Sequence, residues 1–165
     1  MILIAYDGSE DAIAAVEAAG RLMSGQPALV LTVWEPFTMI LSRTPVSMGS
    51  IGGYGDISHI DAESRAGAQR EAAEGARLAC QHGLHATGRT VAREGSIAEA
   101  ILSESDLSDA EVIVVGTRGL GAVGSLLLGG VSHAIVQHAG RPVMVVPTPS
   151  LAARRAEARS KRSSP

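Results

Sequence analysis

Short apolar runs alternate along the chain with segments whose apolar residues recur at helical spacing. The runs at 2–6, 28–34, 112–115 and 143–146 are rich in Val, Ile, Leu and Ala, and the run at 85–93 is less apolar. Runs of this length without polar alternation are typical of strands that are buried on both faces of a sheet. A more polar run is typical of an edge strand. The pattern therefore predicts five strands, with the third at an edge of the sheet.

Four helices are expected between these strands. Ser9 is a favourable N-cap, and the acidic pair Glu10 and Asp11 follows it, which stabilises the positive end of a helix dipole. Ser96 and Glu99 have the spacing of a capping box at the start of another helix. The two remaining helices are expected at 61–82 and 131–138.

Strands that alternate with helices predict an α/β domain with an open five-stranded parallel sheet and helices on both faces. We expect the strand order 3-2-1-4-5, in which the first and fourth strands are neighbours. The chain has 165 residues, enough for one domain, which we expect at 1–148. Residues 35–60 interrupt the alternation with prolines and glycines. An irregular connection of this length indicates a functional segment or a mobile one.

Charge is distributed unevenly along the chain. Residues 150–165 carry five basic side chains against one acidic, a net charge of +4, whereas nine basic against sixteen acidic side chains leave −7 for residues 1–149. The basic segment 149–165 is expected to be a frayed helix or a disordered tail. An acidic body argues against a nucleic-acid partner. The aromatic content of 2% argues against a platform for stacking bases.

Cysteine content and the apolar runs restrict the class of protein further. A single cysteine, Cys80, excludes an internal disulfide and a Cys-based zinc site, and we expect it to be a small buried residue. The first apolar run reaches Asp7 with no basic region before it, so no signal peptide is expected. No run approaches the roughly 20 apolar residues that span a membrane. The expected location is the cytoplasm, with no membrane partner.

Two segments that follow the first and fourth strands are candidates for a ligand site, because the carboxyl ends of these strands are expected to meet at one crevice. The first is Asp7-Gly8-Ser9, and the second is 116–132, with six glycines in its first fifteen positions. Bare backbone lets amides approach phosphate oxygens closely, and the following helix adds free N–H groups and its positive dipole end. A flexible loop with glycine turns is the alternative that the glycine content leaves open.

The glycine-rich segment is neither of the common nucleotide-binding motifs. A Walker A loop is excluded because no Gly-Lys-Ser/Thr occurs, and the single lysine, Lys161, lies in the tail. The dinucleotide fingerprint is absent because the first strand leads into Asp7-Gly8-Ser9 rather than a glycine triplet. Without a lysine such a loop can bind a nucleotide but lacks the charge used for fast phosphoryl transfer. We therefore expect no catalytic residues and at most a weak ATPase.

Three features together resemble the universal stress protein family: a strand leading into Asp7-Gly8-Ser9, the spacing Gly116-x2-Gly119-x9-Gly129, and the closing run 131–147. The resemblance covers about residues 1–147, in order. It implies a Rossmann-like fold of the adenine nucleotide alpha hydrolase type that binds ATP with Mg²⁺. It also implies a homodimer paired through the fifth strand. The implied role is that of a nucleotide-linked stress-response or regulatory module, with protein partners that the sequence does not identify.

The resemblance also implies which residues contact the nucleotide. Asp7 would meet the adenine or its near surroundings, and Val33 would hydrogen-bond the base through its backbone. No metal ligand is expected, because His133 and His138 lack the i, i+4 spacing of a zinc pair and are interpreted as surface or packing residues. The remaining residues of the implied site are Gly8 and Ser9 in the first turn, Gly116, Arg118 and Gly119 along the ribose and phosphates, and Gly129, Gly130, Val131 and Ser132 as phosphate donors.

The chain departs from the family pattern at Gly130, where the family has Ser or Thr. One side-chain donor is therefore missing, although the backbone amide remains, and Ser132 is the candidate replacement. A hydrogen bond to a charged group contributes about 1.5–3 kcal/mol, so this loss is expected to weaken binding roughly tenfold. The alternative is a module of the same fold that binds no nucleotide and serves only dimerisation or protein interaction.

Overall fold

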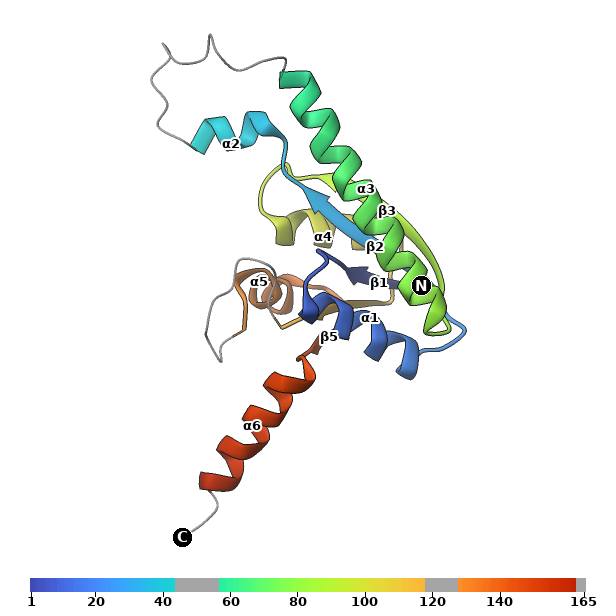
Figure 1. Cartoon of the computed structure of the whole chain (residues 1–165), viewed down its shortest axis with the longest axis vertical. Helices are drawn as coiled ribbons and strands as arrows, with labels where there is room; N and C mark the ends of the chain where they lie inside the picture. The colour runs from blue at the N-terminus through green and yellow to red at the C-terminus, as the bar shows by residue number, and fades with distance from the viewer. Residues whose placement is uncertain (44–56, 118–127, 163–165) are drawn as a thin grey trace.

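The structure of the protein, a computed structural model, describes residues 1–43, 57–117 and 128–162. In this part of the chain a parallel sheet is flanked by helices (Figure 1). The strands are β1 (Ile2–Ala5), β2 (Pro27–Trp34), β3 (His85–Ala92), β4 (Val112–Gly116) and β5 (Val143–Val146). The helices are α1 (Glu10–Leu22), α2 (Phe37–Arg43), α3 (Ile57–Gln81), α4 (Ile97–Leu107), α5 (Gly130–His138) and α6 (Pro149–Arg162).

The sheet has the order β3-β2-β1-β4-β5, and every neighbouring pair is parallel. This confirms the predicted fold class and the edge position of the third strand. In the central strand, Leu3 is paired with Leu29 of β2 and with Ile113 of β4. The carboxyl ends of β1, β2 and β4 therefore meet at one edge of the sheet.

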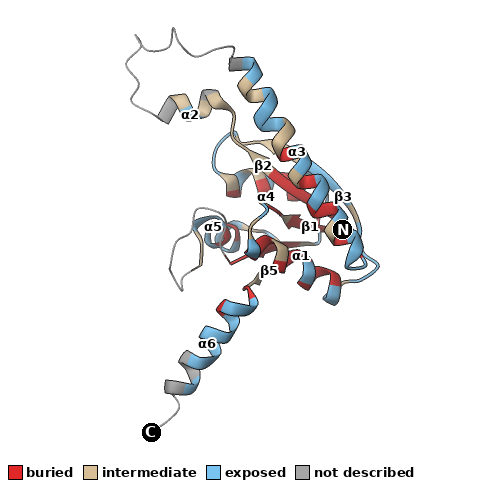
Figure 2. Ribbon diagram, in the orientation of Figure 1, coloured by how far each residue is buried: buried red, intermediate tan, exposed pale blue. Residues whose placement is uncertain are grey.

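Alternate residues of the strands face two separate cores. Ile2 and Ile4 face a core that is closed by the alanines of α1 and α3. Leu3 faces the opposite core, which includes Ile101 of α4 and Ile135 of α5. Strands buried on both faces explain why the sequence shows continuous apolar runs. Figure 2 shows this burial along the sheet, whereas most of α6 is exposed.

Both predicted helix caps are present. The Ser9 hydroxyl accepts a hydrogen bond from the Ala12 amide at 3.2 Å. Ser96 and Glu99 form a complete capping box, in which the Glu99 amide donates to Ser96 Oγ and the Ser96 amide donates to Glu99 Oε2. The carboxylate that accepts this bond has a lowered pKa, chiefly because the Ser96 amide hydrogen bond stabilises its charged form.

The connection after β2 differs from the sequence-based expectation. Residues 37–43 form helix α2, which was not predicted, and α3 begins at Ile57 rather than at 61. The Phe37 amide donates to Asp61 Oδ1 at 2.6 Å, so a contact between two separate helices satisfies the start of α2. The rest of the interrupting segment, 44–56, lies outside the described residues.

The structure also shows the exposure of Cys80 and the conformation of the basic segment. Cys80 is exposed, which corrects its expected burial, because Ala76 and Ala79 occupy the face of α3 that is turned to the sheet. Residues 149–162 form α6, a helix that extends away from the sheet (Figure 1). Leu151 anchors its first turn and is 2% exposed. A helix is one of the two forms expected of this basic segment.

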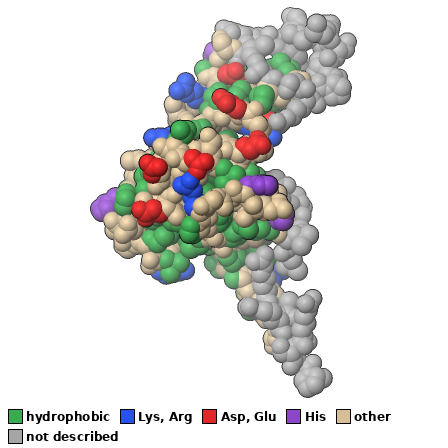
Figure 3. Space-filling view, turned by 180° about the vertical axis from the view of Figure 1, so that it is seen from behind, with side chains coloured by type: hydrophobic (Ala, Val, Ile, Leu, Met, Phe, Trp, Pro, Cys, Tyr) green, Lys and Arg blue, Asp and Glu red, His purple; other side chains and the backbone are tan. Residues whose placement is uncertain are grey.

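No helix in the described ranges combines the length and apolar character needed to cross a membrane. On the face drawn in Figure 3 the basic side chains of the described residues stand apart from one another among acidic, polar and apolar ones. This distribution agrees with the acidic net charge of residues 1–149.

Candidate functional site

A cavity of about 570 Å³ opens at the carboxyl ends of β1, β2 and β4. Its lining comes from the ends of these strands, from α3, and from the N-terminal parts of α1, α4 and α5. The lining residues are Ala5, Tyr6, Asp7, Ala12, Leu31, Thr32, Val33, Glu35, Glu71, Ile97, Ile101, Val115, Gly116, Gly129, Gly130, Val131 and Ser132. Asp7 of the first segment singled out in the sequence and the described residues Gly116 and 129–132 of the second thus line one cavity.

The turn after β1 holds Asp7 in a defined orientation. Its Oδ1 accepts hydrogen bonds from the Ser9 amide at 3.2 Å and from the Ser9 hydroxyl at 2.6 Å. Ser9 also caps α1, so its side chain is committed to the turn and the helix. Gly8 has a φ of +73°, a left-handed conformation that a residue with a side chain rarely adopts. Gly8 and Ser9 shape the turn, and Asp7 supplies the cavity with a carboxylate.

Gly116, the last residue of β4, lets α1 approach the sheet. A Cβ at this position would lie 2.7 Å from the backbone carbon and oxygen of Asp11 in α1. The carbonyl of Gly116 accepts a hydrogen bond from the buried Ser132 hydroxyl at 2.7 Å. These contacts give Gly116 a packing role in addition to its place in the cavity lining.

The N-terminus of α5 presents main-chain donors to the cavity. The Gly129 amide donates to Thr117 O at 2.8 Å, and the first bond of the helix runs from the His133 amide to Gly129 O. The amides of Gly130, Val131 and Ser132 lie before that first bond and have no acceptor within the helix. We call these three amides the amide wall. The hydroxyl proton of Ser132 is already donated to Gly116, so the amide is the donor that Ser132 offers.

Space around Gly130 is open. Among the described residues, a Cβ there would have no atom within 4 Å, and no side chain of these residues caps the helix at Gly129. A hydroxyl-bearing residue would therefore fit at position 130.

The end of β2 supplies a third side of the cavity. Val33 and Thr32 line it, and the Thr32 hydroxyl donates to Tyr6 O at 3.0 Å, which joins the ends of β1 and β2. Glu35 forms an ion pair with Arg93 at 3.1 Å. Val33, predicted from the resemblance, is thus placed beside Asp7 in the same cavity.

Glu71 of α3 also lines the cavity, and sequence reasoning missed it. Its Oε1 lies 3.3 Å from the position that a Cβ on Gly8 would occupy, which places it beside the Asp7 turn. Burial and the neighbouring charges of Asp7 and Glu74 raise the pKa of Glu71. Burial, followed by the charges of Glu74, Glu71 and Asp7, also raises the pKa of Tyr6. We call Asp7 and Glu71 the acidic wall.

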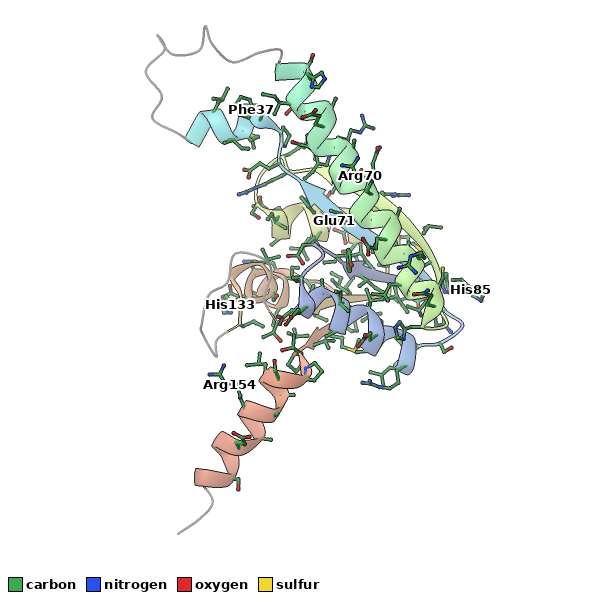
Figure 4. The ribbon with its side chains drawn as sticks, in the orientation of Figure 1. Phe37, Arg70, Glu71, His85, His133 and Arg154 are labelled. Carbon is green, nitrogen blue, oxygen red and sulfur yellow. The ribbon has the colours of Figure 1, made fainter. Side chains whose placement is uncertain are left out.

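The amide wall and Glu71 of the acidic wall belong to helices on either side of the turn after β1. Figure 4 labels Glu71 on α3 and His133 on α5, with the turn after β1 between the two helices. A helix N-terminus attracts anions, whereas carboxylates accept hydrogen bonds from hydroxyl and amino groups. The cavity therefore suits a ligand that has an anionic group at one end and hydrogen-bond donors at the other.

Two predicted site residues are not among the described ones. Arg118 and Gly119 fall outside the described residues, together with the rest of the segment 118–127. His133 and His138 are exposed on α5, which confirms their interpretation as surface residues. In the described ranges, no three His, Cys, Asp or Glu side chains gather in a way that could hold a metal ion.

Comparison with known proteins identifies the family of this chain. A model of the universal stress protein family matches residues 1–147. The chain belongs to the universal stress protein family. A universal stress protein of Thermus aquaticus is 36% identical over 149 residues, which cover 88% of this chain and 96% of that relative. The predicted family is therefore confirmed, and α6 lies beyond the matched residues.

Solved structures share the fold. A universal stress protein in complex with cAMP has 22% sequence identity and a TM-score of 0.59, and the match covers 89% of this chain and 96% of that one. A universal stress protein from Archaeoglobus fulgidus in complex with dAMP has 18% identity and a TM-score of 0.51, with 88% and 95% covered. These members of the universal stress protein family each bind an adenine nucleotide.

Proposed function

We propose that the protein binds an adenine nucleotide, ATP with Mg²⁺, in the cavity between α3 and α5, and acts as a nucleotide-linked stress-response or regulatory module. The observation that carries this proposal is that the amide wall and the carboxylate of Asp7 line the same cavity. The complexes of family members with cAMP and dAMP support an adenine nucleotide as the ligand class.

Each part of the cavity has a role in this proposal. The amides of Gly130, Val131 and Ser132 bind phosphate oxygens, with Gly129 and Gly116 keeping the backbone close. Asp7 accepts hydrogen bonds at the nucleoside end, and the backbone of Val33 hydrogen-bonds the base. Contacts of Arg118 and Gly119 with the ribose and phosphates stay a prediction. Mg²⁺ would be held by the phosphates, because it commonly binds proteins together with substrate phosphates and water.

Binding rather than turnover is the proposed activity. The cavity lining contains carboxylates and main-chain amides but no lysine or arginine, so the charge that stabilises a transferring phosphoryl group is missing from the described lining. We therefore propose at most a weak ATPase. Phosphate release by the protein should not exceed that of an Asp7→Ala variant by more than a small factor. We propose the cytoplasm as its location.

Ligand-dependent thermal unfolding tests the proposal. ATP, ADP, AMP and cAMP are added separately at increasing concentration, and inorganic triphosphate at equal ionic strength serves as the control. A ligand that binds only the folded state stabilises it by about 2.7 kcal/mol at 100 times its dissociation constant, so the melting temperature should rise with nucleotide concentration. No rise with any of the four at millimolar concentration would contradict nucleotide binding and favour the nucleotide-free interaction module.

We also propose that two copies pair through β5. Among the described strands, β5 is paired with β4 alone, and it is half-buried along its length. An apolar edge strand is prone to pair with another chain. Its bonds to β4 use Pro142 O and Val146 O. Because bonding directions alternate along a strand, the main chain of Val145 faces the free edge.

A proline at this free edge tests the dimer. Val145→Pro removes a donor that faces the partner but none that faces β4. In sedimentation velocity the unchanged protein should be a dimer and the variant a monomer, with both retaining a cooperative thermal transition. A monomeric unchanged protein would contradict the pairing.

A further inference from the structure

Glu71 is a carboxylate of the cavity lining to which the proposed function assigns no role. It lies on α3, is half-buried, and faces both the cavity and the Asp7 turn. No ion pair between described residues includes it. A carboxylate in a cavity without a basic partner leaves its charge available to act on a ligand.

The groups around Glu71 add negative charge to the same part of the cavity. Asp7 in the turn after β1 and Glu74 on α3 both act on it with like charge. Tyr6 at the end of β1 is neutral at physiological pH, since its pKa is raised. Glu35 at the end of β2 lines the same cavity but is paired with Arg93.

The basic groups nearest in sequence on α3 do not offset this field. Arg70 and Arg77 are exposed and absent from the cavity lining. Arg77 acts on Tyr6 and is not among the groups that act on Glu71. The α3 side of the cavity is therefore anionic over the described residues.

We propose that Glu71 is a specificity-determining residue, which with Asp7 rejects ligands that carry a second anionic group at the nucleoside end. A 5′-phosphate directed to the amide wall leaves the nucleoside beside the acidic wall. A second phosphate on the sugar then lies close to two carboxylates and is repelled. The cavity thereby selects nucleotides with a single anionic end. This proposal rests on the proposed nucleotide binding.

Titration calorimetry with two probes tests the selection. 5′-AMP carries one phosphate position, and adenosine 3′,5′-bisphosphate adds a second on the sugar. Each is measured at pH 7.5 with the unchanged protein, with Glu71→Gln, and with Glu63→Gln. Glu63 is the matched control because it is an exposed carboxylate of the same helix outside the cavity lining.

The expected result is a change in preference rather than in overall binding. The unchanged protein and Glu63→Gln should favour 5′-AMP over the bisphosphate, and Glu71→Gln should reduce that preference roughly five-fold. As the pH is lowered, the preference of the unchanged protein should fall toward that of Glu71→Gln, because protonation removes the charge of Glu71 and its raised pKa brings protonation on earlier than for an ordinary Glu. A thermal melt of each variant verifies folding.

Contrary results separate the two proposals. If 5′-AMP binds and its preference over the bisphosphate is the same in all three proteins, Glu71 does not determine specificity, although nucleotide binding stands. If none of the three proteins binds either probe, the proposed nucleotide binding fails and the role of Glu71 fails with it.

Discussion

The acidic wall and the amide wall bring opposite charge to one cavity by different means. Asp7 is held by two hydrogen bonds from Ser9, and Glu71 reaches the same place from α3. The amide wall has no functional side chain, and its donors are the main-chain N–H groups at the start of α5. One wall therefore depends on residue identity, whereas the other depends on backbone position.

This difference determines what substitutions do. On the acidic wall, a change of side chain alters the charge directly. On the amide wall, a change of side chain acts only through the space and the backbone conformation that it needs. Gly116 and Gly130 show the contrast, because a Cβ would collide with α1 at the first position and meet no atom at the second.

Gly116→Ala should have the largest effect. The added Cβ would lie 2.7 Å from the Asp11 backbone, so α1 must shift, at a cost of about 1–3 kcal/mol or more. Thermal or denaturant unfolding measures this loss. Gly130→Ala is the matched control and should change stability by less than about 0.5 kcal/mol. Equal losses at the two glycines would contradict the packing role of Gly116.

Asp7→Ala should weaken binding of 5′-AMP roughly tenfold, because the nucleoside end loses a charged acceptor. Calorimetry against the unchanged protein measures the change. Glu17→Ala removes an exposed carboxylate of α1 outside the cavity and should leave the affinity as it is. If Asp7→Ala binds as well as Glu17→Ala, the nucleoside end of the ligand does not contact the acidic wall.

Gly130→Ser should strengthen binding of ATP by about three- to tenfold, since it adds a hydroxyl donor beside the amide wall. The open space at this position accommodates the side chain. Gly130→Ala separates the effect of the hydroxyl from that of a stiffer backbone. An affinity of Gly130→Ser no higher than that of Gly130→Ala would place the phosphates away from α5.

Glu71→Gln should change stability less than Gly116→Ala does, and the sign of its effect depends on pH. The folded protein raises the pKa of Glu71 through burial, Asp7 and Glu74, so the stability linked to its protonated form is lost as the pH rises through the folded pKa. Glutamine cannot ionise. The variant should therefore be more stable than the unchanged protein at pH 7.5, by less than about 1 kcal/mol because solvent screens this half-exposed group.

Below the pKa of an unfolded Glu the two proteins should converge, apart from the constant difference between a carboxyl and an amide. Denaturant unfolding at pH 4 and pH 7.5 measures this. If the stability difference between Glu71→Gln and the unchanged protein is the same at both pH values, burial and the neighbouring charges do not destabilise the charged form of Glu71.

Local sequence signals predicted part of the site correctly. The cap at Ser9 and the capping box at Ser96 depend on hydrogen bonds that span three residues, so the sequence shows both partners together. Glu71 gave no such signal, because its neighbour Asp7 is distant in the sequence. On a helix with a mostly solvent-exposed surface, the sequence does not distinguish Glu71 from the other glutamates. Helix α2 was missed for the same reason, since Asp61 of α3 satisfies its first amide.

Local patterns in the chain were enough to predict the alternation of strands and helices, the buried strands and the meeting of Asp7 with Gly116 at the strand ends. Burial and capping depend on residues that are close together in the sequence. Three features required the folded chain to be known: Glu71 lies beside the Asp7 turn, the Ser132 hydroxyl donates to Gly116 O, and Cys80 is exposed. These depend on how helices rotate and pack against the sheet, and that rotation is a balance of contacts among residues distant in the chain.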